Sequence, residues 1–334
     1  VSLGCSPARA SAPAGIFLVG GAARENRRMW QTLPNSQCDL GESPFWHPQE
    51  RSLYWLDIPG RAVLRTRGDL PHPAVERWAL PTEPGCMAPA RSGGLVIALR
   101  DGIYRARQWG GELQPMVKVD HDVRTLRFND GKCDAFGRLW AGSINEAKDA
   151  ASAKLYCLDA RAGREPQLAV MAEGATTANG LAFSPDAHTV YWADTPTHAV
   201  RAWEWDAQAN LLSNERLFHR FAGKPEGWRA EQPAGYGGRP DGASVDAQGR
   251  YWVAMYEGAQ LVCLDANGKL LEALPVPAQC PTMPCFGGDD LRTLFITTGR
   301  HGRGSGELAR LPDSGSVFHT RVDSPGLPVN FFDD

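Results

Sequence analysis

Residues 179–195 read NGLAFSPDAHTVYWADT, and residues 241–255 read DGASVDAQGRYWVAM. Each stretch opens with a polar residue, continues through an apolar segment and a turn, and ends in a strand-like run with Trp, Tyr or Leu. Four further stretches follow this plan with small variations: ESPFWHPQERSLYWLDI at 42–58, CMAPARSGGLVIAL at 86–99, NDGKCDAFGRLWAGS at 129–143 and TMPCFGGDDLRTLFITT at 282–298. The six starts lie 41 to 62 residues apart. A repeat of short strands with this period is typical of a propeller with one four-stranded blade per repeat. We therefore predict an all-β, six-bladed β-propeller.

The repeats predict a single propeller domain over residues 30–334 of the 334-residue chain. Residues 1–29 lack the repeat and are rich in Ala, Gly and Arg, so we expect a flexible N-terminal extension there. Residues 222–240 have little strand character and lead into Asp241, which makes them a candidate lid or, alternatively, a solvated insertion on the outer rim. No amphipathic helix is predicted, and the Gly-rich residues 299–306 are expected to form a turn.

The composition excludes some classes of partner. Charged residues make up 22% of the chain and the formal net charge is −3, so there is no basic field to hold nucleic acid or an anionic membrane. No segment has the length and apolar character of a membrane span. The eight cysteines form no C-x-x-C pair. Reduced thiols and a cytoplasmic location are therefore expected.

An oxygen donor opens four of the six repeats. If the blades are equivalent, these side chains occupy equivalent places near the central channel. They are Glu42, Asn129, Asn179 and Asp241.

Three of these donors form a candidate metal site. Glu42, Asn179 and Asp241 offer two carboxylates and an amide oxygen, and oxygen ligands of this kind suit a hard divalent cation. Calcium is favoured, with zinc, manganese or magnesium as alternatives. Singly, Asn-Gly and Asp-Gly pairs are ordinary hairpin turns. The shared register across blades favours one metal ion in the central channel.

A second pair of side chains is predicted to bind a ligand. Strand alternation places Arg127 and Asn129 on the same face, where a guanidinium and an amide can hydrogen-bond the hydroxyl groups of a polyol-like ligand. The alternative for Arg127 is a salt bridge to a neighbour such as Asp130.

The motifs LGESPFW, RFNDGK, ANGLAFSPD and RPDGASVDAQGRYWVA, in this order, resemble the SMP-30/gluconolactonase/LRE family. The resemblance covers roughly residues 30–330. It implies a six-bladed propeller with one divalent metal in the channel. The family's three metal ligands fall on Glu42, Asn179 and Asp241.

The same resemblance implies substrate contacts. The family's substrate-binding arginine and asparagine fall on Arg127 and Asn129. Some members add a sugar-contacting glutamate whose aligned position here is Ala147. Glu146 stands one place earlier, and we take it as the candidate for that contact. Asp130 would then support the site from outside the metal's ligand set, or hold a water molecule.

The function implied is a metal-dependent hydrolase that opens a sugar (aldono-) lactone to the aldonic acid. The metal would polarise the lactone carbonyl, and Asp241 would act as general base. The expected partner is a small-molecule sugar lactone, not nucleic acid or a membrane. The alternatives are a metal-dependent esterase or phosphotriesterase on the same propeller, and a non-catalytic calcium-binding propeller. The sequence identifies neither the particular lactone nor the oligomeric state.

Overall fold

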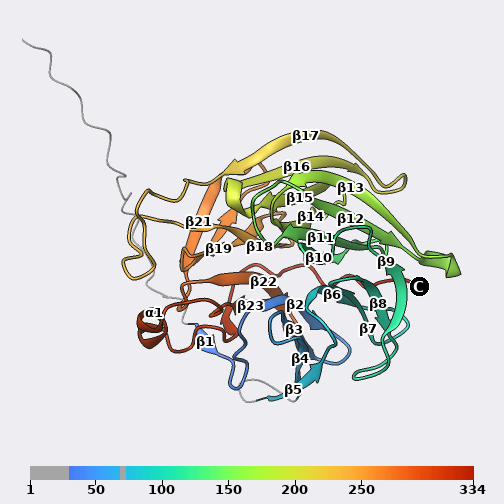
Figure 1. Ribbon diagram of the computed structural model, residues 1–334, viewed down its shortest axis with the longest axis horizontal. Helices are drawn as coiled ribbons and strands as arrows, with labels where there is room; N and C mark the ends of the chain where they lie inside the picture. Colours follow the sequence, from blue (N-terminus) through green and yellow to red (C-terminus); the bar gives the residue numbers. More distant parts are fainter. Residues whose placement is uncertain (1–29, 68–72) are drawn as a thin grey trace, which may run out of the picture.

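The protein is a six-bladed β-propeller, seen along its short axis in a computed structural model (Figure 1). The structure describes residues 30–67 and 73–334. The prediction of an extension over 1–29 lies outside the described residues. The predicted architecture of six four-stranded sheets is confirmed.

Within each blade, neighbouring strands pair antiparallel and the first strand lies innermost (Figure 1). The first blade consists of β2 (Gly41–His47), β3 (Ser52–Asp57), β4 (Ala62–Arg67) and β5 (Ala74–Ala79). The second consists of β6 (Pro84–Pro89), β7 (Leu95–Leu99), β8 (Gly102–Ala106) and β9 (Gln114–Lys118). The third consists of β10 (Leu126–Cys133), β11 (Leu139–Asn145), β12 (Ala153–Asp159) and β13 (Gln167–Ala175). The next two consist of β14 (Ala178–Phe183), β15 (Thr189–Asp194), β16 (Ala199–Asp206) and β17 (Leu211–Arg220); and β18 (Arg239–Val245), β19 (Tyr251–Tyr256), β20 (Gln260–Leu264) and β21 (Leu270–Pro275).

The sixth blade closes the ring with strands from both ends of the described chain. Three of its strands are β22 (Pro281–Gly287), β23 (Thr293–Thr298) and β24 (Phe318–Arg321), and the fourth is β1 (Gln31–Thr32). Strand β1 pairs with β24, with Gln31 opposite His319. The inner strands β2, β6, β10, β14, β18 and β22 contact one another in that order, and β22 contacts β2. The six inner strands therefore surround one central axis.

The hydrophobic core lies between neighbouring blades. One cluster joins blades two and three and includes Phe128 and Phe332, and another joins blades four and five. The Trp of the repeat occupies the second strand in four blades, and each of these four is at most 2% exposed: Trp55, Trp140, Trp192 and Trp252. Burial of these large rings makes the repeated Trp a blade-packing residue.

The cysteines that the structure describes are free and buried. Cys157 and Cys263 lie in the matching strands β12 and β20, where they are small core residues.

One short helix was not anticipated. Helix α1 (Ser305–Arg310) begins within the Gly-rich segment that was expected to be a turn, and its six residues are too few to show an amphipathic period. The turn prediction holds for His301 and Gly302. Within the described ranges, no helix has the length and apolar character needed to cross a membrane.

Candidate functional site

Each inner strand carries one extra residue relative to its partner strand. In β18, Pro240 pairs with Met255 and Ala243 pairs with Val253, so Asp241 and Gly242 lie opposite a single residue. The same two-against-one arrangement occurs in β2, β10 and β14, whereas in β6 and β22 a single unpaired residue stands between consecutive pairs. A bulge of this kind bends the strand and redirects its side chains.

The predicted oxygen donors all lie at these bulges, but in two adjacent positions. Glu42 and Asn179 are the last paired residues before the bulge. Asn129 and Asp241 are the first residues within it. The four donors therefore lie at the same bulge in their blades, but Asn129 and Asp241 stand one position further along the strand than Glu42 and Asn179.

Left-handed backbone follows two of the donors. Ser43 has φ +49° and Gly180 has φ +60°. A Cβ on Gly180 would lie 2.4 Å from the Tyr251 hydroxyl, which donates a hydrogen bond to the Gly180 carbonyl at 2.7 Å. The Ser43 hydroxyl accepts a hydrogen bond from the backbone N–H of Met87 at 3.1 Å and so connects the first two blades. Ser43 therefore places strained backbone directly beside the candidate site, whereas Gly180 adopts the same region without strain.

A chain of hydrogen bonds joins three blades at the bulges. Asn129 Nδ2 donates to Asn179 Oδ1 at 2.9 Å, and Asn179 Nδ2 donates to Thr195 Oγ1 at 2.7 Å. Thr195 Oγ1 in turn donates to the carbonyl of Pro240 at 2.7 Å, next to Asp241. The network fixes the Asn179 amide and leaves Oδ1 a second lone pair. Thr195 carried no signal in the sequence, because it stands outside the repeated opening positions.

Three buried carboxylates share this region. Glu42, Asp130 and Asp241 are 8%, 6% and 6% exposed, and none forms an ion pair within the described ranges. Burial raises the pKa of Glu42 well above its usual range, and the charges of Asp241 and Asp130 raise it further. Burial and the charge of Asp130 raise the pKa of Asp241 to about 8. The three acids therefore repel one another in a poorly solvated place.

Asp130 has one unused oxygen. Its Oδ2 accepts a hydrogen bond from the backbone N–H of Leu181 at 2.9 Å. Its Oδ1 is buried and has no hydrogen-bond partner among the described residues. A buried carboxylate oxygen without a donor is costly unless a ligand, a water or an ion satisfies it.

Arg127 and Asn129 lie together. Arg127 Nη1 donates to Asn129 Oδ1 at 3.0 Å and to the carbonyl of Phe128 at 2.9 Å. The alternative salt bridge to Asp130 is not formed. Arg127 Nε lies 3.4 Å from Glu146 instead.

Glu146 joins two arginines. Its two oxygens accept hydrogen bonds from Arg100 at 2.8 and 3.0 Å, in addition to the contact with Arg127. Hydrogen bonding from Arg100 lowers the pKa of Glu146 despite its partial burial. Glu146 therefore positions Arg127, and its carboxylate is already engaged. Ala147, at the position aligned with the family glutamate, has no polar side-chain atom to offer.

The donor set fits a hard divalent cation. It combines the carboxylates of Glu42 and Asp241 with the Asn179 amide oxygen, and the unused oxygen of Asp130 belongs to the same acidic group. In the described part of the chain, no three His, Cys, Asp or Glu side chains form a metal-binding group by themselves. A site built on Glu42 and Asp241 would therefore need the Asn179 amide as its third donor. A cation there would offset the repulsion between the buried acids.

Residues 222–240 enter β18 from the end at which Asp241 lies. The Tyr236 hydroxyl lies 2.7 Å from His198 Nε2, and the ring of Trp228 packs edge-on to Tyr236. Lys224 Nζ contacts Glu257 at 2.9 Å. The segment is thus held against blades four and five, with Tyr236 buried, and movement as a lid remains a prediction.

The comparisons with known proteins agree over most of the chain. The family described as SMP-30/Gluconolactonase/LRE-like region matches residues 40–300. The chain is 38% identical over 293 residues to a 6-deoxy-6-sulfogluconolactonase from Pseudomonas putida, covering 88% of this chain and 94% of that protein. It is 30% identical over 303 residues to regucalcin from Oryctolagus cuniculus, covering 89% and 95%.

Solved structures show the same fold. A calcium-binding regucalcin from Agrobacterium tumefaciens superposes with a TM-score of 0.80 at 22% identity, covering 91% of this chain and 97% of that one. A gluconolactonase from Xanthomonas campestris gives a TM-score of 0.67 at 24% identity, covering 91% and 92%. At these identities the likeness establishes the propeller architecture.

Proposed function

This chain belongs to the SMP-30/gluconolactonase/LRE-like family, and from that premise we propose that it is a divalent-metal-dependent lactonase. It would open a sugar (aldono-) lactone to the corresponding aldonic acid. The observation that carries the proposal is the group of mutually repelling buried acids, Glu42, Asp130 and Asp241, beside a fixed amide at the strand bulges.

Glu42, Asn179 and Asp241 would hold the cation. Calcium is the first choice because all three donors are oxygens, with zinc, manganese and magnesium as alternatives. When bound, such an ion supplies Lewis-acid polarisation of the lactone carbonyl.

Asp241 would act as the general base. Its carboxylate would take a proton from the water whose oxygen attacks the carbonyl carbon. The ring carbon–oxygen bond would then break, and the same proton would pass to the departing ring oxygen. The products are a carboxylic acid and a free hydroxyl on one open chain.

Arg127 and Asn129 would orient the sugar. Arg127 has donors beyond those used for Asn129 and Phe128, and these suit ring hydroxyls or a carbonyl. Glu146 would contribute by holding Arg127 in place. Correct placement of the ring raises the rate because the reacting atoms start close together.

The substrate panel should include charged and neutral lactones. The Pseudomonas putida relative is named for a lactone that carries a sulfonate. In this chain, Arg239 and Lys148 lie close enough to Asp241 to oppose the rise in its pKa. These cations are compatible with an anionic substituent on the sugar, so 6-deoxy-6-sulfogluconolactone should be compared directly with gluconolactone.

The main test is Asp241→Ala. We expect kcat/KM for the best lactone to fall roughly 10³-fold or more, because the base and one cation ligand are lost together. Calcium binding, measured by titration calorimetry, should be lost as well. Asp289→Ala, at an exposed acid whose side chain is 71% accessible, is the matched control and should change neither quantity. A folded Asp241→Ala protein with wild-type turnover would refute the assignment.

Chelation tests the metal requirement separately. Activity should disappear after prolonged chelator treatment and return when the correct ion is added to the metal-free protein. Persistent activity without any ion would contradict the metal role. Hydrolysis of aryl esters or organophosphates without lactone opening would favour the esterase alternative. Ion binding with no turnover of either class would favour the non-catalytic one.

A further inference from the structure

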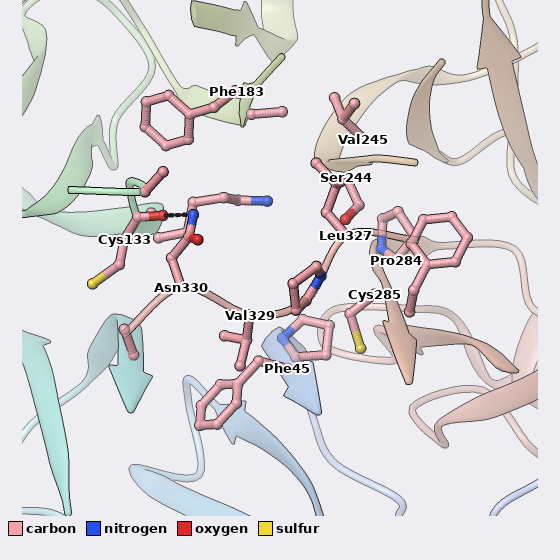
Figure 2. A pocket seen from close by; sticks show the side chains of 18 of the residues that line it. Phe45, Cys133, Phe183, Ser244, Val245, Pro284, Cys285, Leu327, Val329 and Asn330 are labelled. Atoms are coloured by element: carbon pink, nitrogen blue, oxygen red, sulfur yellow. Dashed lines mark hydrogen bonds between the residues drawn. The ribbon is translucent and has the colours of Figure 1, made fainter. Parts of the chain in front are cut away.

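A cavity occupies the central channel on the side of the bulges away from Asp241. Its volume is about 270 Å³, and all six inner strands contribute to its lining. The segment 327–330 crosses it (Figure 2). Exposed residues such as Ala135 and Pro328 also line it, so it opens to solvent on that face.

The cavity begins at the bulges, where Ser43 and Gly131 directly follow Glu42 and Asp130, but Glu42, Asn179 and Asp241 do not line it. In β18 its lining residues are Ser244 and Val245, three and four places after Asp241. A strand advances about 3.3 Å per residue, so these positions lie on the order of 10 Å further along the channel. Phe45 of β2 and Phe183 of β14 follow Glu42 and Asn179 in the same way.

The walls are mainly apolar. Phe45, Phe183, Val245 and Pro284 face the space, together with Val329 of the crossing segment (Figure 2). An enclosed apolar space with a small number of polar groups is the usual form of a small-molecule site.

Lys132 supplies the single charge in this lining. Every other residue of the wall is uncharged. Lys132 Nζ donates to the carbonyl of Ala243 at 2.6 Å and forms no ion pair within residues 30–67 and 73–334. An ammonium group has three donors, so two remain for a ligand. Burial lowers the pKa of Lys132, while the charge of Asp130 opposes this. A bound anion would compensate the buried charge.

The crossing segment is held on both sides of the cavity. Gly326 forms a β-bridge with Asp246, and Phe332, which is fully buried, forms one with Ala90. Between them, Asn330 Nδ2 donates to the carbonyl of Cys133 at 3.1 Å (Figure 2). The segment therefore forms a defined wall on one side of the cavity mouth.

We propose that this cavity is a second small-molecule site, which takes a monocarboxylate with an apolar body. The carboxylate would pair with Lys132, and the apolar body would lie against Phe45, Phe183 and Val329. Nothing in the lactonase proposal requires this site, and its occupancy can be measured without turnover.

Octanoate is the probe, and 1-octanol is its neutral counterpart. Titration calorimetry on the wild-type protein should show octanoate binding. Lys132→Met, which keeps the side-chain stem and removes the charge, should weaken octanoate at least about 10-fold, because a charge-assisted contact is lost. It should change 1-octanol binding much less. Val329→Trp should weaken both probes by filling the space.

Asp241→Ala separates this site from the lactone site. Octanoate binding should persist in that variant, since Asp241 does not line the cavity. Loss of octanoate in Asp241→Ala would overturn the proposal, as would absence of binding in the wild type or an unchanged affinity in Lys132→Met. If Lys132→Met does not fold, the Val329→Trp variant provides the test. Undiminished octanoate binding in that variant would also overturn the proposal.

Discussion

Asp241 lies near the start of strand β18 and Asp246 directly follows its end, and both carboxylates are buried, with 6% and 0% exposure. Asp246 Oδ2 accepts hydrogen bonds from Arg250 Nε at 2.6 Å and Trp252 Nε1 at 2.9 Å. Its Oδ1 accepts two backbone N–H groups of the following turn. Asp241 has no such set of donors, and its pKa is raised to about 8 by burial and by Asp130.

Strand β10 repeats the contrast. Asp130 lies in the bulge with one oxygen unused, whereas Asp134, just beyond the strand, pairs with Arg138 at 2.7 Å and Trp140 at 2.8 Å. In β10 and β18, an acid that follows the strand therefore holds the blade together. The bulge at the other end of these strands collects acids that form no ion pair among the described residues, and a bound cation would compensate their charges.

Asp134→Asn should give the largest change in stability. It removes the charge partner of Arg138, and both side chains are at most 1% exposed. We expect the free energy of unfolding to fall by about 3 kcal/mol, because a buried guanidinium is left without its partner. Asp246→Asn should cost less, since Arg250 is 25% exposed. Urea denaturation monitored by Trp fluorescence measures both.

Asp241→Asn is the counterpart at the other end of the strand. In metal-free protein above pH 8, where the Asp241 carboxylate is ionised, it removes one of several repelling charges, so the free energy of unfolding should stay the same or rise. Equal losses of stability in Asp134→Asn and Asp241→Asn would contradict the contrast between the acids that follow the inner strands and the acids in the bulges.

Gly180→Ala tests the left-handed backbone at the bulge. The change places a Cβ 2.4 Å from the Tyr251 hydroxyl at φ +60°. Gly163→Ala is a matched control, because Gly163 has φ +65° and nothing within 4 Å. The control should cost about 1 kcal/mol from backbone conformation alone. Gly180→Ala should cost at least about 1 kcal/mol more, from overpacking. Equal melting temperatures for the two variants would show that the bulge can relax.

Glu146→Gln should have the smallest effect. Glu146 is partly exposed, so the loss of its pairing with Arg100 and Arg127 should change the free energy of unfolding by less than about 1 kcal/mol. The KM for the lactone should rise a few-fold, because Arg127 is held less firmly, while kcat changes little. A large fall in kcat with unchanged KM would instead assign Glu146 a direct part in the chemistry.

Much of the fold could be predicted because its signals are local. The alternation of the repeats, their turn residues and the Trp found in four of the second strands all lie within about 17 residues of one another. Helix α1 escaped prediction because one and a half turns show no periodicity.

The site was predictable only in part. The opening positions of the repeats named Glu42, Asn179 and Asp241 as candidate ligands. They did not indicate that Thr195 fixes the Asn179 amide, nor that Arg127 contacts Glu146 rather than Asp130. Those choices depend on distances between blades, and no spacing along the chain reports them.

The sequence by itself determined the number of blades, the residues that open each one and the family to which the chain belongs. Only the tertiary structure decided which side chains face one another, that an extra residue bends each inner strand, and that Lys132 borders an apolar cavity. The physical reason is the distance along the chain between the residues that interact. Strand alternation and turn conformation are set by neighbouring residues, whereas the contacts across the channel are set by the joint packing of six separate sheets.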